Sequence, residues 1–399
     1  MPSPDRPFPP PLRGTDPDSF AEDTILHGQS GLLDRAIDLN DFSLETISRL
    51  EALKEAIPNE PIRALDDPAA PDALLWNDYL APYLGQNWLE IPWLVEEFYF
   101  FRRILEATGY FRAGDGQGLD PYEPEKQQGL DLAIERLEIP RAPDPKSRVR
   151  MLLMGSLWGN QADFSMWAAN SKDQPTSHAG DNQAAHILVD DADRAIAVLE
   201  TGPQAAGRID IITDNAGAEL LADLLLVDGL LQDGWTEAVR LHMKPYPTFI
   251  SDATEADLRH MLWRMREAEH DALPAIGRRL EKEMRDGRLQ VKQDTFWVAP
   301  LAFWEIPPGL RGELAQASLI ISKGDANYRR LLGDRHWDFS TPFTEIVSYM
   351  PAPLLALRTL KSNVAAGIPA EQLAAFGEDD QSWMINGEWA VRQFAPAAS

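Results

Sequence analysis

The chain of 399 residues contains no cysteine, which excludes disulfides, thiolate zinc sites, iron–sulfur clusters and cysteine nucleophiles. Basic residues are also scarce, because 37 Lys and Arg stand against 63 Asp and Glu, giving a formal net charge of −26. Nucleic acids and anionic membranes need a basic surface, so neither is expected as a partner. An acidic protein can still bind an anionic metabolite where a metal ion or a few cations reverse the local field.

Long hydrophobic runs and a secretory signal are missing as well. The longest apolar stretch, residues 220–231, is broken by Asp223 and Asp228 and falls short of the ~18 residues that a membrane span requires. The first eleven residues carry six prolines and no apolar signal core, which predicts an extended, poorly ordered leader over residues 1–20. Together with the absence of cysteine, this indicates a soluble protein of the cytoplasm.

After the leader, the chain shows two kinds of hydrophobic pattern. Residues 43–108 are helical in pattern, and a stripe of large apolar residues predicts a helix over 87–109 that ends at Gly109. From residue 208, short β-rich runs alternate with helical stretches, and we expect strands at 209–213, 239–244, 318–322 and 354–359. This alternation predicts a mostly parallel, Rossmann-like α/β/α sandwich with a helical N-terminal lobe. We place the lobe at residues 21–200 and the α/β domain at 201–399.

Polar residues lie beyond the ends of the first two predicted strands. Asp214 and Asn215 come after the first strand, and Asp252 comes after the second, just before a helix that Thr254 would cap. Ligands bind beyond the carboxyl ends of strands in open α/β sheets, and carboxylate and amide oxygens suit Mg²⁺ or Mn²⁺. The alternative is that Asp214 or Asn215 only caps the next helix. Glu219, one turn further on, either adds negative charge to this rim or lies on a solvated helix face.

The other two strand ends carry a glycine turn and two cations. Residues 323–325 (KGD) form a turn whose backbone amides could hold phosphate oxygens, although an ordinary Gly-Asp turn explains them equally well. Arg358 and Lys361 follow the fourth strand, where they would either neutralise a phosphate or pair with nearby carboxylates. A divalent cation held by acids opposite a lysine is suited to metal-assisted hydrolysis of a phosphate ester. Either a bound water or a carboxylate could then be the nucleophile.

Other motifs are weaker. The glycine-rich run 114–118 lacks the preceding strand and following helix of a dinucleotide or S-adenosylmethionine turn. The seven histidines show neither HExxH nor paired zinc spacing, and no GxSxG nucleophile elbow is present.

With these segments identified, the chain resembles subfamily III of the damage-control phosphatases, once called domain of unknown function 89. The family's human representative has also been described as a protein-glutamate methyltransferase. The resemblance covers about residues 20–390 and includes the RTxK motif that marks the subfamily. It is carried by residues 92–103 (PWLVEEFYFFRR), 156–163 (SLWGNQAD), 213–217 (TDNAG), 249–254 (FISDAT), 323–329 (KGDANYR) and 358–361 (RTLK).

The resemblance implies a cytoplasmic, metal-dependent phosphatase acting on sugar phosphates such as fructose 1-phosphate and fructose 6-phosphate. The implied metal is Mn²⁺, Co²⁺, Ni²⁺ or Mg²⁺, held by Asp214, Asn215 and Asp252, with Asp214 and Asp252 as the catalytic pair. The implied substrate-binding residues are Asp214, Asn215, Gly324, Asp325, Ala326, Asn327, Tyr328 and Lys361. Residues that the resemblance implies near the site are Glu97, Asn160 and Arg358, of which Arg358 is expected to be structural. Glu219 is added to them only from its position one turn after Asn215. Ala326 stands where relatives often have a larger residue, which could alter sugar specificity.

Two other functions stay open at this stage. One is an S-adenosylmethionine-dependent protein-glutamate O-methyltransferase, for which the run 114–118 is a badly placed cofactor loop. The other is a non-catalytic metal-binding protein. The oligomeric state and the physiological substrate are not predicted.

Overall fold

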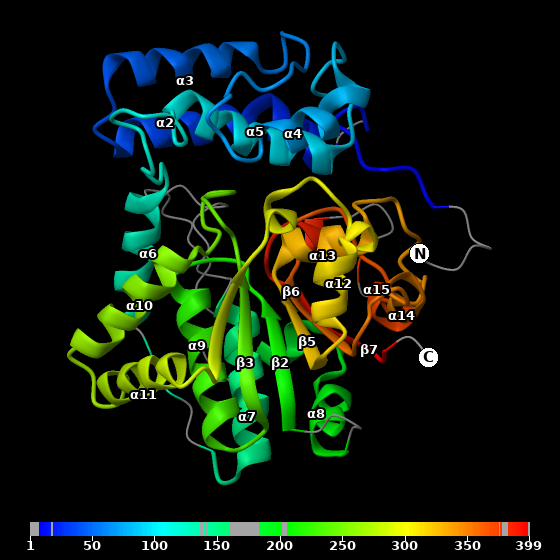
Figure 1. The fold of residues 1–399 in the computed structure, drawn as a ribbon. Helices are drawn as coiled ribbons and strands as arrows, with labels where there is room; N and C mark the ends of the chain where they lie inside the picture. Colours follow the sequence, from blue (N-terminus) through cyan, green and yellow to red (C-terminus); the bar gives the residue numbers. More distant parts are fainter. Residues whose placement is uncertain are drawn as a thin grey trace.

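A computed structural model describes residues 8–16, 19–135, 137, 139, 142–159, 183–201, 206–374, 376 and 382–397. A layer of helices from the first third of the chain lies across one edge of an α/β sandwich (Figure 1). The sandwich confirms the predicted mixed α/β class with a mostly parallel sheet.

The sheet has seven strands in the order β1-β7-β6-β5-β2-β3-β4. All neighbouring strands are parallel except β6 and β7. Successive connections run from β2 toward β4 on one side and from β5 toward β6 on the other, so the topological switch point lies between β2 and β5. The strands are β1 (Ile187–Asp190), β2 (Ala206–Ile212), β3 (Thr236–Met243), β4 (Leu289–Gln293), β5 (Ala317–Lys323), β6 (Leu354–Thr359) and β7 (Ala390–Ala395).

The four predicted strands correspond to β2, β3, β5 and β6, while β1, β4 and β7 were not predicted. Both faces of the central strands are buried, which explains their nearly continuous apolar sequence. Ile212 and Ile320 pack toward one face, whereas Ile211 and Leu319 pack toward the other. Successive residues along a strand therefore pack against opposite helical layers.

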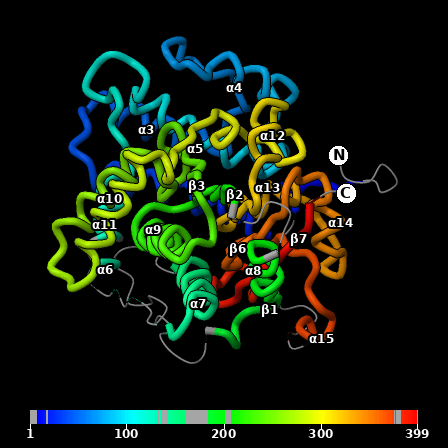
Figure 2. The backbone as a smooth tube through the Cα atoms, turned by 60° about the horizontal axis from the view of Figure 1, so that its bottom comes forward, coloured from blue at the N-terminus to red at the C-terminus, as the bar shows by residue number. Residues whose placement is uncertain are grey.

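Helices cover both faces of the sheet (Figures 1 and 2). One face packs against α6 (Glu123–Glu135), α7 (Pro145–Trp158), α8 (Ala192–Thr201), α9 (Gly217–Gln232), α10 (Glu255–Glu267) and α11 (Leu273–Arg285). The other packs against α12 (Pro308–Leu314), α13 (Asp325–Leu332) and α14 (Phe343–Ile346), and the chain also forms α15 (Ala370–Leu373). Short 3-10 turns are η2 (Ala81–Tyr83), η4 (Gln183–His186), η5 (Thr295–Val298), η6 (Phe303–Glu305) and η7 (Ser382–Met384).

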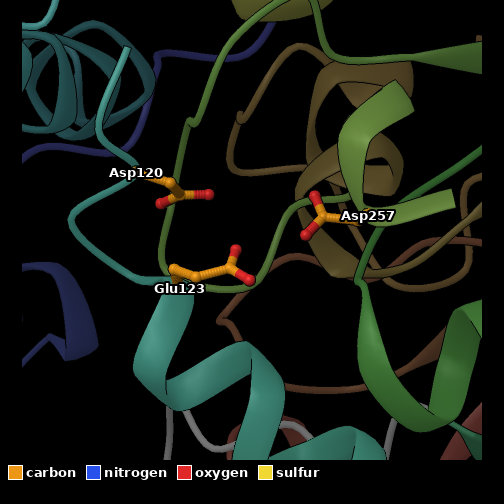
Figure 3. Close-up of side chains that lie close together, drawn as sticks. All are labelled: Asp120, Glu123 and Asp257. Carbon is orange, nitrogen blue, oxygen red and sulfur yellow. The ribbon is translucent and has the colours of Figure 1, made fainter. Parts of the chain in front are cut away.

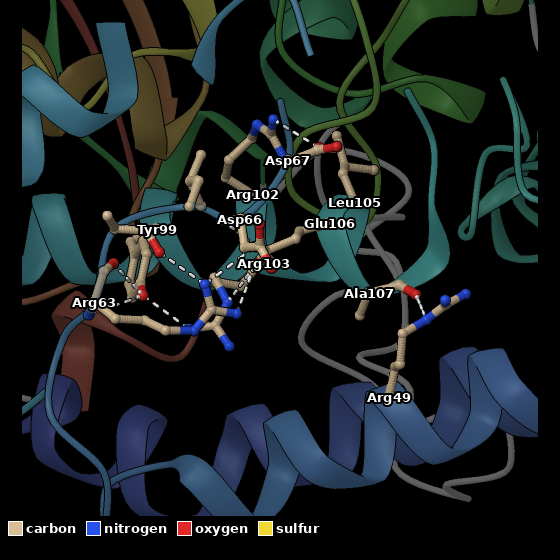
Figure 4. Close-up of polar contacts among 12 residues, drawn as sticks. Arg49, Arg63, Asp66, Asp67, Tyr99, Arg102, Arg103, Leu105, Glu106 and Ala107 are labelled. Carbon is tan, nitrogen blue, oxygen red and sulfur yellow. Dashed lines mark hydrogen bonds and ion pairs between the residues drawn. The ribbon is translucent and has the colours of Figure 1, made fainter. Parts of the chain in front are cut away.

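The helical layer is centred on α5, which is buried along its length and ends at Gly109 in the left-handed conformation, as predicted. Its elements are α1 (Phe20–Asp23), the π-helical turn η1 (Thr24–Gly28), α2 (Gln29–Leu39), α3 (Leu44–Ala56), α4 (Ala73–Leu80) and α5 (Trp93–Thr108). Polar contacts join α5 to its neighbours (Figure 4). Arg63 donates to Glu106 at 3.0 Å, and Arg49 donates to the carbonyl oxygen of Ala107 at 2.7 Å.

The predicted boundary at residue 200 and the leader over residues 1–20 stay predictions, although two observations bear on them. β1 and the sheet-packed α7 precede residue 200 in the chain. Phe8 stacks on Trp304 with ring centroids 4.7 Å apart, so residue 8 already contacts the α/β body. Among the helices described, none combines the length and apolarity that crossing a bilayer requires.

Candidate functional site

The segments that follow β2 and β3 are paired through their backbones. An antiparallel bridge joins Asn215 to Asp252. On either side of it, Ala253 donates its N–H to the carbonyl oxygen of Asp214 at 2.7 Å, and Ala216 donates to that of Ser251 at 2.6 Å. The backbone itself therefore holds the two predicted acidic segments side by side at the carboxyl edge of the sheet.

Helix capping does not account for Asp214 or Asn215. The residue before α9 is Ala216, and no side chain caps this helix. In contrast, α10 begins with the predicted capping box, in which Thr254 and Asp257 bond each other's backbone amides. Neither helix therefore uses Asp214, Asn215 or Asp252 as its N-terminal cap.

These side chains line a cavity of about 470 Å³ between the helical layer and the sheet edge. Seven of the predicted site residues are among its walls, and they come from the ends of β2, β3, β5 and β6 and from α5. They are Glu97, Asp214, Asn215, Asp252, Asp325, Ala326 and Lys361. The convergence of four strand ends that the sequence predicts is thus present in the structure.

Asp214, Asn215 and Asp252 are all buried, with exposed fractions of 5%, 5% and 2%. The Asn215 side chain is oriented by hydrogen bonds, since its Oδ1 accepts from the Ser251 hydroxyl at 2.7 Å and its Nδ2 donates to Glu219 at 3.0 Å. Lys244 pairs with Asp252 at 3.1 Å. Two carboxylates and a carboxamide converging on one buried wall are a donor set that fits a hard divalent cation.

The turn after β5 lies directly against Asp214, at the switch point of the sheet. Gly324 has φ +81°, and a Cβ atom there would lie 1.8 Å from Asp214 Oδ2. Asp325 opens α13 and accepts from Arg358 Nε at 2.7 Å and from the Lys361 N–H at 3.2 Å. Burial alone would raise the pKa of Asp325, but the charges of Arg358 and Arg329 outweigh it and lower this pKa.

Replacing Gly324 with alanine is therefore expected to damage the site more than the fold. The backbone conformation disfavours any side chain, at a cost of about 1–3 kcal/mol, and the new methyl group must displace Asp214. We expect about a hundredfold loss of catalytic efficiency, measured as phosphate release. Gly155→Ala on α7 is the matched control, because its Cβ meets no atom within 4 Å. Equal activities of the two variants would contradict this account of the turn.

Glu219 does not line the cavity but belongs to a buried charged cluster behind Asn215. Lys323 Nζ donates to Glu219 at 2.8 Å and to the carbonyl oxygen of Ser156 at 2.5 Å, and it pairs with Asp223 at 3.1 Å. Burial, partly opposed by Lys323 and reinforced by Asp223, raises the pKa of Glu219 to about 7. The interpretation of Glu219 as a solvated helix face is therefore wrong, since the side chain is 1% exposed.

Three further predicted residues lie beneath the cavity wall. Asn327 Nδ2 donates to the carbonyl oxygen of Thr213 at 3.1 Å, which ties α13 to the end of β2. Tyr328 donates to Gln393 at 2.8 Å, and Arg358 lies over its ring at 4.3 Å. Arg358 is fully buried, as expected for a structural residue. The substrate-binding roles of Asn327 and Tyr328 stay predictions, and Asn160 lies outside the described residues.

Apart from Glu97, the sequence analysis missed the part of the cavity that the helical layer provides. These lining residues include Phe20, Gln29, Leu32, Arg35, Trp93, Phe100 and Phe101. Arg329 also lines the cavity, and its guanidinium bridges Glu97 and Asp334 and lies 3.7 Å from the centre of the Trp93 ring. Arg329 could have been found, because it ends the KGDANYR segment.

A second acidic group lies away from this cavity, where Asp120, Glu123 and Asp257 face one another (Figure 3). One carboxylate oxygen from each lies within 4.8 Å of the others, so the group could hold a metal ion. However, the buried Lys126 ammonium already lies 2.7 Å from Asp120 and 3.0 Å from Asp257. The chain's own cation therefore compensates two of the three carboxylates.

Comparisons with known proteins found a matching family model, curated relatives and a solved structure. The model of the damage-control phosphatase ARMT1-like domain matches residues 27–375. "Damage-control phosphatase ARMT1" of Danio rerio is 33% identical over 88% of this chain and 85% of its own length. The human protein of the same name is 30% identical, with coverages of 96% and 98%. A solved DUF89 family protein from Pyrococcus horikoshii has a TM-score of 0.44 at 15% identity, covering 84% of this chain and 90% of that one.

These names favour phosphatase over methyltransferase chemistry, and the run 114–118 is not part of the cavity lining described above. The family model spans most of the chain, including every strand that contributes to the cavity. The chain therefore belongs to the ARMT1-like damage-control phosphatase family.

Proposed function

We propose that this protein is a metal-dependent phosphatase that hydrolyses phosphate monoesters of small sugars, of the fructose 1-phosphate or fructose 6-phosphate type. Family membership supports a phosphatase-type hydrolase with a small-molecule substrate. The observation that carries the proposal is the backbone bridge between Asn215 and Asp252, because it holds the proposed ligands together whatever occupies the cavity.

In this proposal, Asp214, Asn215 and Asp252 hold Mn²⁺, Co²⁺, Ni²⁺ or Mg²⁺, and Asp214 and Asp252 are the catalytic pair. Such a cation polarises a phosphoryl oxygen and lowers the pKa of bound water. The Ser251 and Glu219 contacts orient the Asn215 amide so that its oxygen and nitrogen are fixed. The backbone N–H of Lys361 is anchored by Asp325, and its ammonium group binds the phosphate oxygens. The helical layer provides the wall of the cavity opposite the strand ends.

The first test is phosphate release from a panel of sugar phosphates with Mn²⁺, Co²⁺, Ni²⁺ or Mg²⁺. We expect turnover that EDTA abolishes and that added metal restores, because the acidic ligands of the site cannot replace the cation's charge. Turnover that survives EDTA would refute the metal dependence. Binding of S-adenosylmethionine without phosphate release would favour the methyltransferase, and metal uptake with neither would favour the non-catalytic protein.

A further inference from the structure

Three basic residues line the cavity, and their charges are compensated to different extents. The Arg329 side chain is 3% exposed, and its guanidinium is held between Glu97 and Asp334. Lys361 belongs to the proposed phosphate site. Arg35 comes from α2 in the helical layer, and 27% of its side-chain surface remains exposed. Arg35 therefore gives the cavity a second cation that a ligand can reach.

The Arg35 guanidinium is only partly used within the protein. Its Nε donates to Glu125 Oε1 at 3.3 Å, and among the residues that the structure describes Glu125 is its one ion-pair partner. Glu125 lies near the start of α6 and is 8% exposed, so this contact restrains the guanidinium at the cavity wall. The two terminal NH2 groups donate to none of the described residues. Two N–H donors in one plane match the two oxygens of a carboxylate or a phosphate.

Arg35 and Lys361 lie toward opposite sides of the cavity. Lys361 follows β6 and donates its backbone N–H to Asp325 at the start of α13. Arg35 is tied to α6, where Lys126 pairs with Asp257 of α10, the helix after β3. β5 and β2 separate β6 from β3 in the sheet, and α6 and α13 lie on opposite sides of β3 (Figures 1 and 2). An ester whose phosphate is bound near Lys361 can therefore extend toward Arg35.

We propose that Arg35 forms a second anion subsite in the cavity, which binds a carboxylate or a second phosphate at the end of the substrate away from the reacting phosphate. The protein then prefers sugar phosphates that carry a second anionic group over those whose other groups are only hydroxyls. An anion is favoured because charge-assisted hydrogen bonds are roughly twice as strong as neutral ones. This inference rests on the proposed phosphatase function and narrows its substrate class.

The test compares 6-phosphogluconate with sorbitol 6-phosphate. The two esters share the carbon chain and the phosphate, and they differ only at C1, which is a carboxylate in the first and a hydroxymethyl group in the second. We expect the wild-type protein with Mn²⁺ to hydrolyse 6-phosphogluconate with an about 10-fold higher kcat/KM, the range of a hydrogen bond between charged groups. Arg35→Gln should remove this preference, mainly through KM, and should change kcat/KM for sorbitol 6-phosphate less than about threefold.

Arg259→Gln is the matched control, because the Arg259 side chain is 67% exposed, pairs with Glu255 and does not line the cavity. If Arg35→Gln does not fold, Arg35→Lys decides, since an ammonium group keeps the charge but loses the planar pair of donors, and it must lower the preference at least about threefold.

A wild-type protein that shows no preference would overturn the second subsite. Equal losses on both esters in Arg35→Gln would also overturn it, because they would place Arg35 at the reacting phosphate. Phosphate release from none of the esters, fructose 6-phosphate included, would instead refute the proposed function. Calorimetric binding of 6-phosphogluconate and sorbitol 6-phosphate to the wild type and to Arg35→Gln would then still decide on Arg35.

Discussion

Replacing Asp252 with asparagine is expected to lower kcat/KM for the best sugar phosphate about a thousandfold, equivalent to about 4 kcal/mol of transition-state stabilisation. The substitution keeps the size of the side chain and its backbone bridge to Asn215, but removes one of two carboxylates from the proposed metal site. Metal affinity, measured by calorimetry with Mn²⁺, should fall together with phosphate release. Unchanged turnover would remove Asp252 from the catalytic pair.

A loss of stability must be separated from this loss of activity. Asp252 pairs with Lys244 at 3.1 Å, and both side chains are buried, so the asparagine variant leaves a buried ammonium group without its partner carboxylate. The double variant Asp252→Asn/Lys244→Met should therefore regain stability in urea unfolding while remaining inactive. Asp271→Asn, at an exposed position, is the control for a change of charge alone. Activity that returned with stability would show a structural role only.

Much of the cavity could be predicted from the sequence because parallel strands leave little freedom at their carboxyl ends. Once 209–213 and 239–244 are recognised as neighbouring strands, Asp214 and Asp252 must follow at the same edge of the sheet. The N-terminal cap of α10 could also be predicted from the sequence, since Thr254 and Asp257 have the spacing of a capping box. These are local patterns whose spatial consequence is fixed by the fold class.

The contributions of the helical layer could not be predicted in this way. Whether Arg35 faces a cavity depends on how α2 packs against α5 and the sheet, which no periodicity in residues 29–39 specifies. β4 was not predicted because its sequence, LQVKQ, is short and about half polar. Such a composition is common in a strand at the edge of a sheet, where β4 lies. Glu219 was ambiguous for a related reason, since its buried partner Lys323 is 104 residues away.

Replacing Lys323 with methionine is expected to destabilise the folded protein by about 3–5 kcal/mol at pH 8, because it leaves Glu219 and Asp223 buried without their cation. Urea unfolding measures the change. Lys282→Met is the matched control, since Lys282 pairs with Asp286 in an exposed ion pair at the end of α11, and such exposed pairs contribute little to stability. Equal midpoints for the two variants would show that the buried cluster does not need its ammonium group.

The loss of stability caused by Lys323→Met should also depend on pH. It should be larger at high pH, because burial disfavours the charged form of Glu219. The pKa of Glu219 in the folded protein is already raised to about 7, so the folded state binds a proton more tightly than the unfolded chain does. Stability from this group is therefore greatest below its unfolded pKa and is lost as the pH rises through about 7. Without Lys323 the carboxyl pKa rises further. At pH 5 the buried acids can become neutral, and the cost of the substitution should shrink, whereas a purely steric defect would give the same loss at both pH values.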